Sequence, residues 1–134
     1  MILNDPKSFS IEVTGETTEQ KYSGVFKIKP LLSHRDRLRR DEIKRQLLGV
    51  NSESGTGVAA MRTAEIFSKI WVHLLEPVPA WWKEAGNGLD LLDEEPVVAL
   101  IDRIVTIEQE LLGMTNKEAE KAKEELVVLA KKQE

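Results

Sequence analysis

Residues 67–96 read FSKIWVHLLEPVPAWWKEAGNGLDLLDEEP, and this stretch decides how the chain folds. It contains all three tryptophans and three of the five prolines, and it joins the two most hydrophobic helical segments of the chain. Pro77 disfavours a helical conformation in the residue before it, and Pro79 favours an extended path. We therefore expect one helix to end near Glu76 and a loop to connect it to a second hydrophobic helix.

The helix expected before the prolines carries one apolar face. Its apolar residues follow one another at intervals of four, three, four and three, and they are Ala60, Ala64, Phe67, Trp71 and Leu74. This spacing places them on one side of a helix that packs on the core. His73 falls on the opposite side, so we expect it to face solvent and to bind no metal. The preceding segment 51–57, NSESGTG, contains no residue that would fix it in a core and is typical of a loop.

The loop after the prolines brings two adjacent tryptophans, Trp81 and Trp82, close to a GNG turn at 86–88. Neighbouring side chains in a loop do not point the same way, so we expect one tryptophan to anchor the loop in the core and the other to lie at its rim. Tryptophan is enriched at the energetic centres of protein interfaces. The loop is therefore a structural joint first and a candidate contact site second.

The second hydrophobic helix has a start signal in which Asp93 caps the helix and Pro96 lies in the first turn. Its apolar residues cover an arc near half the circumference, and they include Val97, Leu100, Ile101, Ile104, Ile107 and Leu111. An arc this wide predicts burial on two sides. Glu108 projects into that arc. It either reaches water where the helix leaves the core or forms an ion pair at an interface.

Gly113 is expected to end this helix, because glycine readily adopts the left-handed conformation found at helix ends. The residues TNKE at 115–118 form a capping box for a further helix. That helix, over 115–134, has a narrow apolar stripe rich in alanine. We expect it either to be loosely attached or to dock on another subunit.

The N-terminal part alternates apolar and polar residues, as half-buried β-strands do. One face of the first run carries Phe9, Ile11 and Val13, and one face of the second carries Tyr22, Gly24, Phe26 and Ile28. Two such runs around a glycine-containing loop predict a β-hairpin over 8–30, and Pro30 ends its second strand.

A basic helix is predicted next, because Ser33 and Asp36 form a helix-start signal and Gly49 is a natural stop. Its basic residues are Arg35, Arg37, Arg39, Arg40, Lys44 and Arg45. Opposite charges four residues apart predict a solvated helix held by its own ion pairs. The alternative is a helix whose arginines contact nucleic acid or an acidic protein surface. No aromatic residue is interleaved for stacking on bases, which weakens the nucleic-acid version.

The composition is that of one soluble domain, with 134 residues, 41% hydrophobic residues, 31% charged residues and a net charge of −4. We expect an α+β, mostly α fold with the hairpin at 8–30, a helical core at 33–113 and the C-terminal helix at 115–134. The absence of cysteine excludes disulfides, thiol catalysis and cysteine zinc sites. No catalytic, metal or nucleotide motif occurs, so we expect neither an enzyme nor a cofactor.

No apolar run approaches the roughly 20 residues that span a bilayer. The start of the chain, MILNDP, lacks the basic residues and long apolar run of a signal peptide. We therefore expect a soluble, intracellular protein that does not enter a membrane.

Five segments carry a family likeness: FKIKPLLSHRDR at 26–37, QLLGVN at 46–51, HLLEP at 73–77, PAWW at 79–82 and GLDLLDEEP at 88–96. In this order, within about 9–113, they resemble the tail assembly chaperones of long-tailed bacteriophages. The resemblance implies a non-virion protein of the host cytoplasm that binds the helical tape-measure protein. It would keep this client soluble while tail tube subunits assemble around it.

The resemblance also implies self-association and a longer, frameshifted form whose additional domain recruits the tail tube protein, so that this chain is the short form. The candidate partner contacts are Trp81, Trp82, Leu92, Ile107, Leu111, Arg35, Arg39 and Arg40. One alternative is a structural phage protein, such as a capsid accessory or head–tail connector. Another is a nucleic-acid-binding regulator that uses the basic helix, which the negative net charge disfavours.

Overall fold

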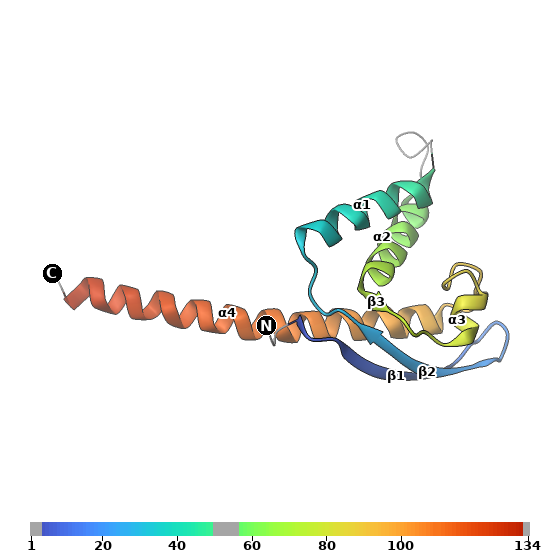
Figure 1. Cartoon of the computed structure of the whole chain (residues 1–134), viewed down its shortest axis with the longest axis horizontal. Helices are drawn as coiled ribbons and strands as arrows, with labels where there is room; N and C mark the ends of the chain where they lie inside the picture. Colours follow the sequence, from blue (N-terminus) through green and yellow to red (C-terminus); the bar gives the residue numbers. More distant parts are fainter. Residues whose placement is uncertain (1–3, 50–56, 133–134) are drawn as a thin grey trace.

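The computed structural model describes the backbone of residues 4–49 and 57–132 and the side chains of 4–49 and 57–113. Within these ranges, three β-strands and four α-helices follow one another in the order β1, β2, α1, α2, β3, α3 and α4 (Figure 1). The α+β, mostly α fold class predicted from the sequence is confirmed. The loop predicted at 51–57 lies outside the described residues except for Gly57.

The predicted hairpin is present as β1, Lys7–Thr14, and β2, Lys21–Ile28. The strands are antiparallel and Phe9 lies opposite Phe26, so the alternating apolar side chains of both strands share one face. A short strand β3, Leu74–Leu75, pairs antiparallel with the other side of β2. Two residues at the end of an apolar helical pattern carry no strand signal, so the sequence does not predict β3.

The basic helix α1, His34–Leu48, begins at the predicted capping box. The Ser33 hydroxyl accepts a hydrogen bond from the Asp36 amide at 3.2 Å, and the Asp36 carboxylate accepts one from the Ser33 amide at 2.9 Å. The second helix α2, Val58–His73, ends just before β3, and a short helix α3, Ala80–Glu84, carries the two adjacent tryptophans. The prolines therefore separate α2 from α3 as expected, although part of the predicted loop is helical.

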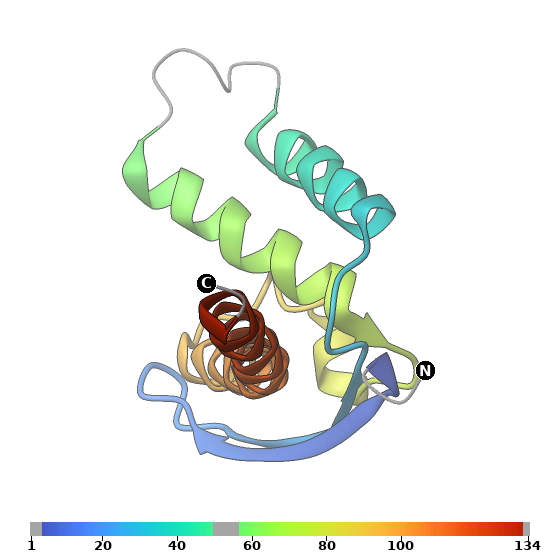
Figure 2. The same ribbon diagram turned by 90° about the vertical axis from the view of Figure 1, so that its left-hand side faces the viewer.

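The long helix α4, Glu95–Lys132, lies at the centre of the fold. Figure 2, which looks along α4, shows the hairpin on one side of it and α2 on the other, with α1 packed against α2. Leu100 and Ile104 of α4 have no exposed surface. The two-sided burial predicted from the wide apolar arc is thus observed in this part of the helix.

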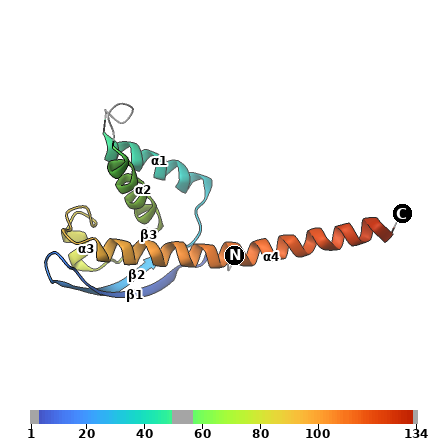
Figure 3. The same ribbon diagram turned by 180° about the vertical axis from the view of Figure 1, so that it is seen from behind.

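The prediction that Gly113 ends this helix is wrong, because α4 runs through it without interruption to Lys132. Glycine inside a helix costs only about 1 kcal/mol relative to alanine, and starting a separate helix at 115 would cost a new nucleus. Figures 1 and 3 show the C-terminal half of α4 extending away from the body of the protein. Among the described elements, none lies beside it. The predicted fourth helix is therefore a continuation of the third.

Two polar residues are also placed differently from their predictions. His73 is fully buried rather than solvent-facing, because the last turn of α2 lies beside Lys29, whose amide donates to the His73 carbonyl at 2.8 Å. Asp93 does not cap α4. It is 2% exposed, and its carboxylate is directed at the loop of the β-hairpin.

Candidate protein-binding surfaces

An apolar groove of about 510 Å³ lies between α2, the loop that follows α3 and the first turns of α4. Its apolar lining is Ile66, Phe67, Leu89, Leu91, Leu92, Val97 and Val98. Its charged lining residues are one base, Arg62, and two acids, Asp93 and Glu94. We call this feature the apolar groove.

Three large apolar side chains of the groove are exposed to solvent. Leu92 is 74% exposed, Val98 58% and Leu89 42%. A few isolated apolar residues are normal on a protein surface, but neighbouring ones that line a hollow mark an interaction site. The apolar groove can therefore receive an apolar side chain or one face of a helix.

The tryptophans hold the loop that forms one wall of this groove. The Trp71 indole nitrogen donates to the Asn87 carbonyl at 2.9 Å. Asn87 and Gly88 both adopt positive φ angles, 56° and 93°, and a Cβ at Gly88 would come within 2.5 Å of the Trp82 ring. Gly88 is therefore required for the close approach of the loop to Trp82.

Asp93 fixes the other end of the same loop to the β-hairpin. Its carboxylate accepts hydrogen bonds from the Thr17 amide at 2.8 Å, the Thr18 amide at 3.1 Å, the Thr18 hydroxyl and the Tyr22 hydroxyl at 2.7 Å. The hydrogen bonds from Thr18 and Tyr22 lower the pKa of Asp93, and the same contact raises the pKa of Tyr22. A buried, fully bonded carboxylate locks the hairpin loop to the start of α4 and holds the groove in shape.

The two adjacent tryptophans separate as predicted into a core residue and a rim residue. Trp82 is 1% exposed and packs between the rings of Phe26 and Phe67, with centroid distances of 5.7 and 6.5 Å. Trp81 is half-buried, and its indole nitrogen donates to the Ser23 carbonyl at 2.9 Å. Core packing therefore accounts for Trp82, while Trp81 retains surface that a partner can reach.

The remaining candidate contacts do not form one site. Leu92 lines the apolar groove, whereas Arg39 lines a separate cavity of about 440 Å³ beside Trp71 and β3. Arg40 lines a third cavity with Arg37, and exposed Arg35 lies in the first turn of α1. Ile107 is half-buried against the core, and Leu111 is half-buried on α4.

The ion pairs predicted within α1 are absent from the described residues. Asp36 instead pairs with Lys29 at 2.7 Å. Burial raises its pKa, but the hydrogen bonds from Lys29 and Ser33 outweigh this effect and bring it to about 2. Lys44 and, at 3.8 Å, Arg40 lie against Glu65 of α2. The basic helix is thus joined to its neighbours rather than to itself, and it is not simply a solvated helix.

A partly buried ionic cluster joins α2 to α4. Lys69 contacts both carboxylate oxygens of Glu108, at 2.9 and 3.1 Å. His73 Nε2 lies 3.3 Å from the same carboxylate, and its Nδ1 lies 2.6 Å from the Lys29 carbonyl oxygen. Burial lowers the pKa of His73, so the imidazole is neutral at pH 7 and donates from Nδ1. Of the two alternatives for Glu108, the structure shows the ion pair, and it forms within the chain.

Sequence reasoning missed most of the apolar groove. Among its exposed residues, only Leu92 is a candidate contact in the sequence, because Leu89 directly follows the GNG turn and Val98 lies beside the apolar arc of the second hydrophobic helix. A sequence signal is present in LDLLD at 89–93, where three leucines and two acids share a segment too short for a helix. Such a pattern in a loop indicates leucines that the core does not fully absorb.

Comparison with protein-family models, curated proteins and solved structures finds no significant match to this chain. Across residues 4–49 and 57–132, no helix is long and apolar enough to cross a membrane. Over the described side chains, histidine and carboxylate groups form no cluster of three or more that could hold a metal ion. The surfaces above are therefore interpreted from their own chemistry.

Proposed function

We propose that this protein is a tail assembly chaperone of a long-tailed bacteriophage. In this role it binds the tape-measure protein and keeps it soluble during tail tube assembly. The family likeness of the five sequence segments supports the proposal, and three of these segments, at 73–77, 79–82 and 88–96, form the joint around which the fold is built.

The observation that carries the proposal is the apolar groove with its exposed rim of Leu89, Leu92 and Val98. A chaperone for a helical client needs an apolar surface that is open before the client arrives. A helix that lays its apolar face into such a groove is bound through side chains three and four residues apart. The net charge of −4 favours solubility of the free protein while this surface is exposed.

The proposed role places the protein in the host cytoplasm and outside the mature virion. The chain is then the short form, and a longer, frameshifted product recruits the tail tube protein. Self-association belongs to the same proposal. Within it, the C-terminal half of α4, which has no neighbour among the described elements, is available to another subunit (Figure 3).

Co-expression with a candidate tape-measure protein tests the proposal. We expect the wild-type chain to keep the client soluble and to co-purify with it, and Leu92→Asp to reduce the retained client by roughly tenfold, because a charge would be placed against apolar client surface. Leu38→Asp is the matched control. Leu38 is 70% exposed, nearly as much as Leu92, but it lies on α1 away from the groove.

Both variants should keep the wild-type melting temperature, since each replaced side chain is mostly exposed. Equal loss of client in the two variants would show that the groove is not the binding site. Recovery of the protein as a component of purified virions would contradict the chaperone function and favour a structural one.

A further inference from the structure

The third of these hollows, of about 380 Å³, lies on a different part of the surface, between α1, α2 and the middle of α4. Its lining combines three cations with three leucines and one acid, and these residues are Arg37, Arg40, Lys69, Leu31, Leu32, Leu112 and Glu108. We call it the basic pocket. It shares no lining residue with the apolar groove.

The floor of the basic pocket is already neutralised. Glu108 is held by Lys69 through both carboxylate oxygens, and the side chains of the two residues are 19% and 15% exposed. This partly buried pair contributes no net charge. His73 lies beneath it as a neutral imidazole and adds none.

The two arginines of the pocket are not neutralised in the same way. Among the described residues, no ion pair engages the Arg37 guanidinium, which projects from an exposed position of α1. Arg40 has only Glu65 at 3.8 Å, beyond hydrogen-bond distance, and Lys44 holds that carboxylate more closely. Two guanidinium groups with unused donors therefore lie at one hollow, and such groups bind carboxylates in a bidentate manner.

We propose that the basic pocket binds a carboxylate-bearing, amphipathic peptide segment of a protein partner, with Arg37 and Arg40 as its anchors. The acidic side chain would meet the two guanidinium groups, and neighbouring apolar side chains would pack on Leu31, Leu32 and Leu112. The leucines disfavour a free inorganic anion as the ligand. The fixed Glu108 carboxylate and the lack of any aromatic side chain in the lining disfavour a nucleic acid.

This inference does not rest on the proposed chaperone function, because the pocket and the apolar groove are separate. The probe is a short helical peptide built from alanine, leucine and glutamate, and its counterpart with glutamine in place of glutamate is the ligand control. Affinity is measured by fluorescence anisotropy at low salt. We expect the glutamate peptide to bind more tightly than the glutamine peptide, and this difference in affinity to shrink with added salt as charge pairs are screened.

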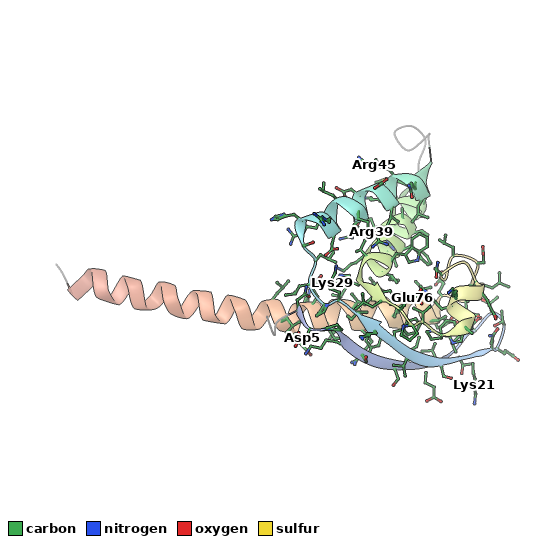
Figure 4. The ribbon with its side chains drawn as sticks, viewed as in Figure 1. Asp5, Lys21, Lys29, Arg39, Arg45 and Glu76 are labelled. Atoms are coloured by element: carbon green, nitrogen blue, oxygen red, sulfur yellow. The ribbon has the colours of Figure 1, made fainter. Side chains whose placement is uncertain are left out.

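The double variant Arg37→Gln and Arg40→Gln should reduce affinity for the glutamate peptide by roughly tenfold, as expected for loss of charge-assisted hydrogen bonds. Arg45→Gln is the matched control, because Arg45 is an exposed arginine near the other end of α1 (Figure 4) and does not line the pocket. It should change the affinity far less. Arg37→Gln alone should give an intermediate loss of affinity. Because Arg37 is exposed, this single variant still tests the inference if the double variant fails to fold.

Three outcomes would overturn the inference. The first is an equal loss of affinity with Arg45→Gln and with the double variant, and the second is no binding of the glutamate peptide to the wild type. The third is displacement of the labelled glutamate peptide by a single-stranded oligonucleotide at a lower concentration than by the unlabelled glutamate peptide. Leu92→Asp should leave the difference in affinity between the glutamate and glutamine peptides unchanged, because Leu92 does not line the basic pocket. The experiments therefore distinguish failure of the proposal for the apolar groove from failure of the proposal for the basic pocket.

Discussion

At the scale of single residues, buried polar side chains fix contacts between elements, as the apolar core residues also do. Asp36, His73 and Asp93 are all buried. Asp36 bonds to Lys29 and to the helix cap, and Asp93 bonds to the hairpin. His73 bonds to the Lys29 carbonyl through Nδ1, while its Nε2 has no hydrogen-bond partner among the described residues. A buried polar group without a partner would be costly. Each of these residues therefore fixes one contact between elements.

Asp36 makes the free energy of unfolding depend on pH in the acid range. Its folded pKa of about 2 lies below the ordinary value of 3.8, so its stabilising effect is complete above pH 3.8 and is lost as the pH falls through about 2. The shift corresponds to about 2 kcal/mol. We expect the urea midpoint of the wild type to fall between pH 5 and pH 2 by more than that of Asp36→Asn, which lacks this titration. Parallel curves for the two proteins would contradict the assignment.

The two adjacent tryptophans should respond differently to truncation. Trp82→Ala empties the centre of the core and should cost about 3–5 kcal/mol, because Trp82 is 1% exposed and packs on two other rings. Trp81→Ala should cost less and, if Trp81 contacts the client, should weaken client binding more than it lowers the melting temperature. Thermal unfolding and client pull-down of both variants provide the comparison. Equal destabilisation would place both side chains in the core.

At the scale of elements, α4 is the feature that most departs from expectation. Gly113 lies inside the helix, and a Cβ added there would meet no atom within 4 Å. Gly113→Ala should therefore stabilise the protein by about 0.5–1 kcal/mol, the usual gain from replacing a helical glycine. The midpoint of urea unfolding and the helical circular dichroism signal should both rise. A lower midpoint would show that Gly113 adopts a conformation that alanine cannot.

Local patterns were sufficient to predict the hairpin, α1 and the two-sided burial of α4. Strict alternation, a capping box at Ser33 and a wide apolar arc are each decided by residues close in sequence. Local patterns failed for β3, for His73 and for Asp93, because these depend on which segments meet in space. The Lys29 amide donates a hydrogen bond to the His73 carbonyl, which places His73 in the core. The amides of the hairpin loop donate to the Asp93 carboxylate, which therefore does not cap the helix.

The candidate site was predictable to a smaller extent. Helical periodicity assigns Val98 to a core arc, although it is 58% exposed beside the apolar groove. The basic pocket needs α1, α2 and α4 to converge, which no spacing within one segment can indicate. Surfaces assembled from several elements require the tertiary structure.

At the scale of the whole molecule, α4 lies between the β-hairpin and the helix pair of α1 and α2 and joins them (Figure 2). The hairpin packs on one side of it and α2 on the other, while α1 reaches it only through α2 and the residues around Glu108 (Figure 2). The apolar groove and the basic pocket both include residues of α4, the first at its start and the second near residue 112. A partner long enough to occupy both would lie along this helix.

The uninterrupted course of α4 past Gly113 makes the helix a rigid spacer. Residues 114–132 would extend about 28 Å at 1.5 Å per residue. A partner bound at the far end would be held at a set separation from the groove and in a set orientation, because a continuous helix transmits both. An assembly built from such units would acquire a regular repeat, whose length is determined by one helix rather than by a flexible tether.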